Sequence, residues 1–143
     1  MARENKNLLD EIYKATKMRL EATQLVIPKV HDKSLRDQIE QQCKGYRGMN
    51  LKAKAMLRED GRLPEEEDSI KKVMLWGNLK INTLVNKKPD HIAEVMINST
   101  ATGIADMTKR LNELDDSDAG AKRLAEDYIV NEQKNIENLE KHL

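Results

Sequence analysis

Apolar residues recur at helical spacing along four long stretches of this chain, and helix-breaking residues separate the stretches. Side chains three or four positions apart share one face of a helix, whereas a half-buried strand alternates with a period of two. Aromatic residues make up 3% of the chain and Phe is absent, which favours helices over strands. The chain is therefore predicted to be all-α. Four long helices and one shorter helix are predicted at about 7–28, 34–58, 69–85, 90–114 and 118–143.

Proline and short polar residues mark the predicted helix ends. Pro28 lacks a backbone donor and disfavours helix at the preceding residue, so the first helix ends there. Either Asp32 or Ser34 can cap the second helix, and Asp90, directly after Pro89, is predicted to cap the helix at 90–114.

The lengths of the connections predict how the helices are paired. A loop of a few residues cannot return the chain along a helix of ~40 Å, so helices joined by short loops must be antiparallel. This pairs 7–28 with 34–58 and 90–114 with 118–143. The helix at 69–85 is long enough to cross from one end of the bundle to the other. Residues 1–143 are therefore predicted to form one four-helix domain with a helical crossover.

Charge and apolar content exclude several classes of partner. Charged residues make up 35% of the chain, but basic and acidic groups are interleaved and the net charge is +0, so a dedicated nucleic-acid or anionic-membrane binder is not expected. No apolar run is long enough to cross a bilayer, and the N-terminus has no signal-peptide pattern. Cys43, the single cysteine, allows no intrachain disulfide. We therefore expect a soluble, cytoplasmic protein.

The order of these elements carries a family resemblance. A hairpin is followed by a crossover that begins with Gly61 to Pro64 and contains Trp76, and a second hairpin contains Glu-x-x-Asn-Ile-x-x-Leu from Glu132 to Leu139. Over about residues 7–143 this arrangement resembles the ferritin-like superfamily, and it is most similar to its small bacterial members. The resemblance implies a four-helix bundle of two antiparallel hairpins, often assembled into oligomers.

The same resemblance locates where a metal site would lie. Ferritin-like di-iron bundles use one Glu from each of two helices and a Glu-x-x-His pair from each of the other two. In chain order the corresponding inward positions hold Arg19, then Cys43 and Tyr46, then Ser99, Thr100 and Gly103, then Glu132 and Asn135. Only Glu132 retains a carboxylate, and His31, His91 and His142 all lie near predicted helix ends. We therefore predict a degenerate site with no metal or other cofactor, in which Glu132 is the residual ligand candidate.

A buried polar layer is predicted in place of the metal. Ionised Arg19 and Glu132 would each be costly in an apolar interior unless they are paired, so we expect them to lie within about 6 Å of each other. Their remaining donors and acceptors would be satisfied by other members of the layer, whose full predicted set is Arg19, Tyr46, Asn50, Ser99, Thr100, Glu132 and Asn135. In the alternative, Arg19 extends to the edge of the bundle and Glu132 is protonated or hydrated.

Three functional hypotheses follow. The leading one is a non-catalytic bundle that associates with itself or with another cytoplasmic protein, with Gly45 and Gly48 permitting close helix contact. In the second, a metal-binding or iron-handling protein has a non-standard site built from Glu132, Glu21 and either Glu94 or Asp106. The third is a small-molecule binder whose mid-bundle cavity is lined by Tyr46, Ser99 and Gly103. Buried Cys43 has no inward His or Lys to activate it, and we expect no enzymatic activity.

Overall fold

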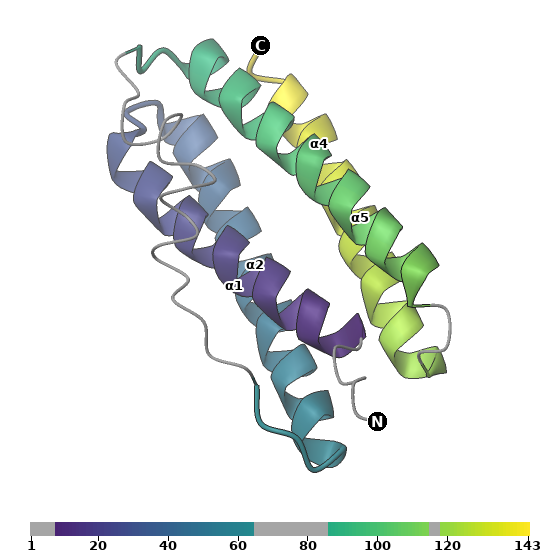
Figure 1. The fold of residues 1–143 in the computed structure, drawn as a ribbon. Helices are drawn as coiled ribbons and strands as arrows, with labels where there is room; N and C mark the ends of the chain where they lie inside the picture. Colours follow the sequence, from purple (N-terminus) through teal and green to yellow (C-terminus); the bar gives the residue numbers. More distant parts are fainter. Residues whose placement is uncertain (1–7, 65–85, 115–117) are drawn as a thin grey trace.

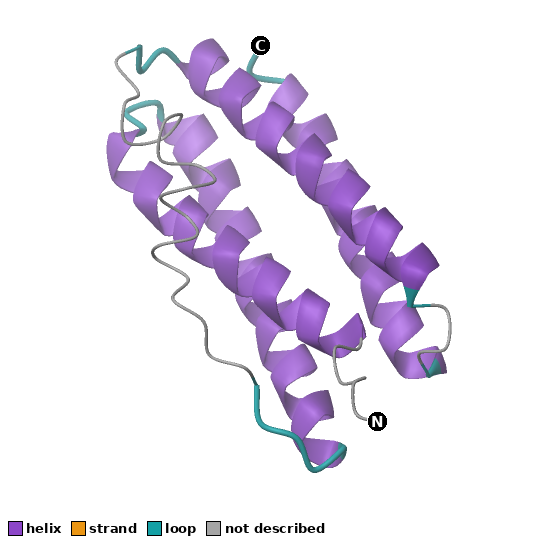
Figure 2. Ribbon diagram, viewed as in Figure 1, coloured by secondary structure: helices purple, strands orange, loops and turns teal. Residues whose placement is uncertain are grey.

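The structure is all-helical throughout the residues it describes. The computed structural model describes residues 8–64, 86–114 and 118–143, and within these ranges there are four α-helices and no strand (Figures 1 and 2). The helices are α1 (Leu8–Val26), α2 (Lys33–Glu59), α4 (Pro89–Glu113) and α5 (Ala119–Glu140), with a short 3-10 helix, η1, at Ile27–Lys29. The all-α prediction is confirmed, with helix ends shifted by one to three residues. The predicted crossover helix at 69–85, including Trp76, lies outside the described residues.

Local chemistry explains the ends of the first hairpin. Pro28 falls in η1, where the chain leaves α-helical geometry, and Asp32 then caps α2 by accepting a hydrogen bond from the backbone N–H of Leu35 at 2.9 Å. The choice left open between Asp32 and Ser34 is thus settled in favour of Asp32. Helix α2 ends before Gly61, whose φ of 71° lies in the left-handed region that glycine adopts without steric cost.

The caps of the second hairpin differ in kind. Asp118 caps α5 and accepts a hydrogen bond from the backbone N–H of Ala121 at 2.8 Å. The prediction that Asp90 caps α4 is wrong: the cap position is Lys88, with no side-chain cap bond, and the helix begins at Pro89. Proline suits the first helical position because a backbone N–H at that position has no partner within the helix, so nothing is lost when proline lacks it. Asp90 lies within the first turn, where its charge favours the helix N-terminus.

The helices pack in two pairs, α1 with α2 and α4 with α5, and the pairs face each other across the core (Figure 1). One apolar cluster joins the start of α1, the end of α2, the end of α4 and the start of α5; its largest members include Leu8, Leu57, Met107 and Tyr128. A second cluster joins the four opposite ends and includes Val26, Leu35, Ile92 and Leu139. Between the two clusters, each helix contributes polar side chains instead.

Two further features bear on the surface. Gly45 and Gly48 make no close contact with another described helix of this chain, because a Cβ added at either position would meet nothing within 4 Å; their contact with a second molecule stays a prediction. Both glycines are exposed. None of the described helices is long and apolar enough to span a membrane.

The two candidate caps of α2 can be separated by mutation. We expect Asp32→Ala to lower the free energy of unfolding by about 1 kcal/mol, because a backbone N–H in the first turn loses its acceptor. Ser34→Ala, two residues on and exposed, should change it by less than about 0.5 kcal/mol. Urea denaturation followed by circular dichroism measures both, and equal losses would contradict the assignment of the cap.

Candidate functional site

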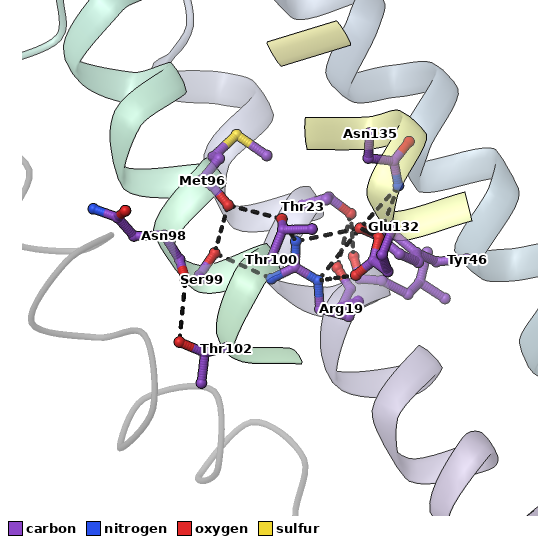
Figure 3. Close-up of polar contacts among 11 residues, drawn as sticks. Arg19, Thr23, Tyr46, Met96, Asn98, Ser99, Thr100, Thr102, Glu132 and Asn135 are labelled. Atoms are coloured by element: carbon purple, nitrogen blue, oxygen red, sulfur yellow. Dashed lines mark hydrogen bonds and ion pairs between the residues drawn. The ribbon is translucent and has the colours of Figure 1, made fainter. Parts of the chain in front are cut away.

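The polar residues between the two apolar clusters form one connected network (Figure 3). Arg19 comes from α1, Tyr46 from α2, Ser99 and Thr100 from α4, and Glu132 and Asn135 from α5. Each lies near the middle of its helix. The position follows from the sequence, because polar residues interrupt the apolar stripe near the middle of every helix, and Arg19, Tyr46, Thr100 and Glu132 meet at one level of the bundle.

Arg19 is the central cation of this network. Its side chain is 2% exposed, and its guanidinium donates to Ser99 Oγ at 3.2 Å, to Thr100 Oγ1 at 2.6 Å and twice to Tyr46 Oη at 3.2 and 3.3 Å. Ser99 and Thr100 in turn donate to the carbonyl of Met96 at 3.0 and 2.7 Å. Because their protons are used in that way, both hydroxyl oxygens are available as acceptors for the guanidinium.

Glu132 is fully buried and divides its two oxygens between different partners. Oε1 accepts a hydrogen bond from Tyr46 Oη at 2.5 Å and another from Asn135 Nδ2 at 2.8 Å. Oε2 lies 3.3 Å from Arg19 Nε, within ion-pair distance, but it has no hydrogen bond of acceptable geometry. We therefore regard the contact at Oε2 as a coulombic attraction without an aligned hydrogen bond.

Tyr46 links the cation to the carboxylate. Its hydroxyl donates to Glu132 and accepts from Arg19 and from Asn135 Nδ2, the last at 3.3 Å. The Arg19 guanidinium also lies 5.4 Å from the centre of the Tyr46 ring, within cation–π range. Tyr46 thus contacts Arg19 through both its hydroxyl and its ring.

The electrostatics of the layer keep Arg19 charged and both nearby tyrosines neutral. Burial acts to lower the pKa of Arg19, but Tyr46 and Glu132 outweigh it, and the pKa lies above its ordinary value. Burial raises the pKa of Tyr46, and Glu132 adds to this rise, although Arg19 opposes it. Burial likewise raises the pKa of Tyr128, with Glu132 again contributing.

The predicted pairing of Arg19 with Glu132 is present, and most of the predicted partners contact the pair. Tyr46, Ser99, Thr100 and Asn135 all hydrogen-bond to one of the two residues. Asn50 does not: it donates to the carbonyl of Tyr13 and to Thr16 Oγ1, at 3.0 and 3.1 Å. The alternative in which Arg19 extends to the bundle edge is wrong, because more favourable partners lie at the centre.

These residues do not fit a ferritin-type di-iron centre. A guanidinium with a fixed positive charge lies 3.3 Å from Glu132, where it would repel a metal cation. Two acids of the metal-site hypothesis lie away from Glu132: Glu94 is exposed, 3.9 Å from His91 Nδ1, and Asp106 is also exposed. The third, Glu21, is half-buried, and no described residue forms a hydrogen bond with its Oε1. Within the described ranges, no group of three or more His, Cys, Asp or Glu residues is placed to hold a metal ion.

Two features were missed by sequence reasoning. Asp10 is 4% exposed and pairs with Arg62 at 2.6 Å, beyond the end of α2. Gln42 is 3% exposed, and neither its Nε2 nor its Oε1 has a hydrogen-bond partner among the described residues. An unsatisfied buried amide costs about 1–3 kcal/mol. The helical spacing of Gln42 from Ile39 and Tyr46, both on the inward stripe, was the signal that could have revealed its burial.

The cavity of the small-molecule hypothesis also differs from the prediction. A hollow of about 240 Å³ lies between α2 and α5, and it is lined by Tyr46 but not by Ser99 or Gly103. At Gly103 an added Cβ would lie 3.4 Å from Tyr128 Oη, tighter than most such contacts. The small residue at 103 therefore allows close packing against Tyr128.

Comparison of the chain with protein-family models, with curated proteins and with solved structures found no match. The site must therefore be interpreted from its own geometry.

Removing one member of the buried pair should lower the stability of the fold far more than removing both. We expect Arg19→Met to lower the free energy of unfolding by about 3–5 kcal/mol, because it leaves Glu132 buried without its cation. Adding Glu132→Met to this variant should recover part of the loss, which gives a coupling energy of about 1 kcal/mol or more in a double-mutant cycle.

The exposed pair formed by Lys33 and Asp37 on α2, at 2.7 Å, is the matched control for this cycle. Solvent screens it, so Lys33→Met and Asp37→Met should be nearly additive. Chemical denaturation of both sets measures the couplings. Additive losses at Arg19 and Glu132 would contradict the assignment of a coupled buried pair.

The raised tyrosine pKa values predict a loss of stability at alkaline pH. Unfolded tyrosine ionises near pH 10, whereas folded Tyr128 keeps its proton at higher pH. Above pH 10 the unfolded state therefore binds fewer protons than the folded state, and stability falls as pH rises. We expect Tyr128→Phe to reduce that slope by about 1 kcal/mol per pH unit between pH 10 and pH 11, where unfolded tyrosine is only partly ionised. Urea denaturation at pH 9, 10 and 11 measures it, and an unchanged slope would contradict the burial of this hydroxyl.

Proposed function

We propose that this protein is a non-catalytic, ferritin-like helical bundle that acts by associating with a second copy of itself. In this proposal two antiparallel hairpins are joined by a crossover through residues 69–85. The membership of the apolar clusters supports the hairpins, since the start of α1 meets the end of α2 and the end of α4 meets the start of α5. The polar layer supports a non-catalytic centre, because Arg19 and the hydroxyl groups bonded to it close the middle of the bundle.

The observation that carries the proposal is an exposed apolar and glycine-containing face formed by α2 and α5. Val130 on α5 is 49% exposed. A hollow of about 220 Å³ lies between the two helices, and Val130 lines it together with Gly48, Lys52 and Asp127. An exposed large apolar side chain beside a hollow is a feature of surfaces that a partner covers. We call this surface, defined by Gly48, Lys52, Asp127 and Val130, the α2–α5 face.

The charges on the two helices favour one way of pairing copies. Between residues 41 and 58, α2 carries five basic residues and no acidic one: Lys44, Arg47, Lys52, Lys54 and Arg58. None of the five forms an ion pair with another residue in the part of the chain that is described. On α5, by contrast, Glu126 and Asp127 are exposed. Two copies with α2 against α2 would repel each other, which disfavours that arrangement.

A two-fold axis that lies in the face, parallel to the two helices and between them, removes this repulsion. Such an axis places α2 of one copy against α5 of the other, twice, so that the same surface is used on both. Lys52 then faces Asp127 of the second copy, while Val130 packs beside Gly48 of the second copy. Gly48 leaves room for a close approach, since a Cβ there would meet nothing within 4 Å.

Charge reversal across the face tests this dimer. We expect the protein to sediment as a dimer at micromolar concentration. Lys52→Glu or Asp127→Lys alone should weaken the dimer at least tenfold, because each places like charges opposite each other. The double variant Lys52→Glu with Asp127→Lys should restore it, since the pair is exchanged and its attraction kept. Sedimentation velocity across a concentration series measures all three.

Reversal of an exposed charge elsewhere is the matched control. Lys109→Glu on α4 lies outside the α2–α5 face and should leave the dimer unchanged. Thermal unfolding monitored by circular dichroism confirms that each variant remains folded. A monomer at all concentrations, or a double variant no better than the single variants, would overturn the proposal.

A further inference from the structure

A second hollow on the same side of the bundle has the features of a binding site. It measures about 240 Å³ and lies between α2 and α5, beside the polar layer, with Tyr46, Glu132 and Asn135 among its lining residues. Gln42, also in the lining, is separated from Gly48 by six residues of α2, or about 9 Å along the helix. The two hollows adjoin, since Met49 and Asn131 line both, but Gln42 lines only this one.

Gln42 is the residue in this hollow whose bonding is incomplete. Its side chain is 3% exposed, and both its amide oxygen and its amide nitrogen are buried without a partner among the described residues. Buried polar groups in folded proteins nearly always have a partner. Gln42 also lines the hollow, so a rotation of its side chain would bring this unpaired donor and acceptor to a ligand there.

The rest of the lining limits the charge of that ligand. Glu132 already pairs with Arg19 and accepts hydrogen bonds from Tyr46 and Asn135, so it has little capacity to bind a cation. The other polar lining residues are mainly carboxamides, namely Gln41, Asn131, Asn135 and Asn138, and the one further charged residue, Lys134, is exposed and solvated. Carboxamides donate and accept without carrying charge. This lining fits an uncharged molecule better than an ion.

The size and the free amide together define the class of ligand. Sites for drug-sized ligands occupy about 300–1,000 Å³, so this hollow fits something smaller. A carboxamide with both atoms free forms two parallel hydrogen bonds with a molecule that presents a donor next to an acceptor, as Gln does with adenine. The sulfur of Met49 and the ring of Tyr128, also in the lining, can cover an apolar face of a flat molecule.

We propose that this hollow binds a small, flat, uncharged molecule with adjacent hydrogen-bond donor and acceptor atoms, of the nucleobase or cyclic-amide class, through the side-chain amide of Gln42. The inference goes beyond self-association and does not require it. The Lys52→Glu variant, designed to weaken the dimer, should therefore bind the same ligands as the unmodified protein.

Adenine and uracil are suitable probes, and 1,3-dimethyluracil is a matched control ligand because methylation removes both ring N–H donors. Titration of ¹⁵N-labelled protein, observed by ¹H–¹⁵N correlation spectra, follows the side-chain amide signals of Gln42 and Asn135. We expect adenine or uracil to shift these signals saturably at millimolar concentration or below. Dimethyluracil should bind at least tenfold more weakly than uracil.

Two substitutions separate the role of Gln42 from a general effect on the fold. Gln42→Leu should weaken binding of the probe at least tenfold, while its melting temperature should stay level or rise, because an unsatisfied buried amide is removed. Gln133→Leu, on the exposed side of α5 and outside the lining, should leave binding unchanged.

Clear outcomes would overturn the proposal. These are an absence of saturable shifts with both adenine and uracil, equal binding of uracil and dimethyluracil, or undiminished binding by Gln42→Leu. The comparison of uracil with dimethyluracil uses the unmodified protein, so it decides the matter even if Gln42→Leu fails to fold. Binding that persists in a monomeric Lys52→Glu variant would support the site whatever the fate of the dimer.

Discussion

The ion pair between Arg19 and Glu132 is the constraint on which the rest of the bundle depends. Two charges removed from water are tolerated only when their attraction and their hydrogen bonds offset the loss of hydration. Here the partners are drawn from every described helix: Tyr46 from α2, and Ser99 and Thr100 from α4, join the pair formed by α1 and α5. All four helices must therefore be in register for the layer to be satisfied.

The layer also divides the apolar core. The apolar side chains on either side of the layer are mainly Leu, Ile, Met and Ala, which can replace one another in a core. A purely apolar bundle could therefore slide by one helical turn with a modest loss of packing. A slide of that size would separate Arg19 from Tyr46 and leave buried charge and hydroxyl groups without partners. We interpret the layer as the feature that fixes one register, a role in which buried polar groups are best attested.

The surface between α2 and α5 has two adjoining hollows, one beside Gly48 and Lys52 and the other beside Gln42. The first combines the exposed apolar side chain of Val130 with charges of opposite sign on the two helices, which fits a self-complementary contact. The second combines neutral carboxamides with a buried amide that lacks a partner, which fits a small uncharged ligand. The chemistry of each hollow therefore favours a different occupant.

The sequence by itself determined the helices and most members of the polar layer. Helical periodicity, Pro28 and Pro89 fixed where helices begin and end to within a few residues, because these are local effects of backbone geometry. The cost of buried charge predicted that Arg19 meets Glu132, since each interrupts an apolar stripe, but it left open the alternative in which Arg19 extends to the bundle edge.

Only the tertiary structure decided which polar groups complete that pair and which remain free. Asn50 and Asn135 have similar side chains, each about one turn along its helix from a member of the layer, yet Asn50 bonds to Tyr13 and Thr16 while Asn135 bonds to Glu132. The difference depends on helix rotation and on side-chain reach of an ångström or two, which periodicity does not specify. For the same reason the open hollow beside Gln42 could not be read from the sequence: it depends on how closely α2 and α5 approach each other.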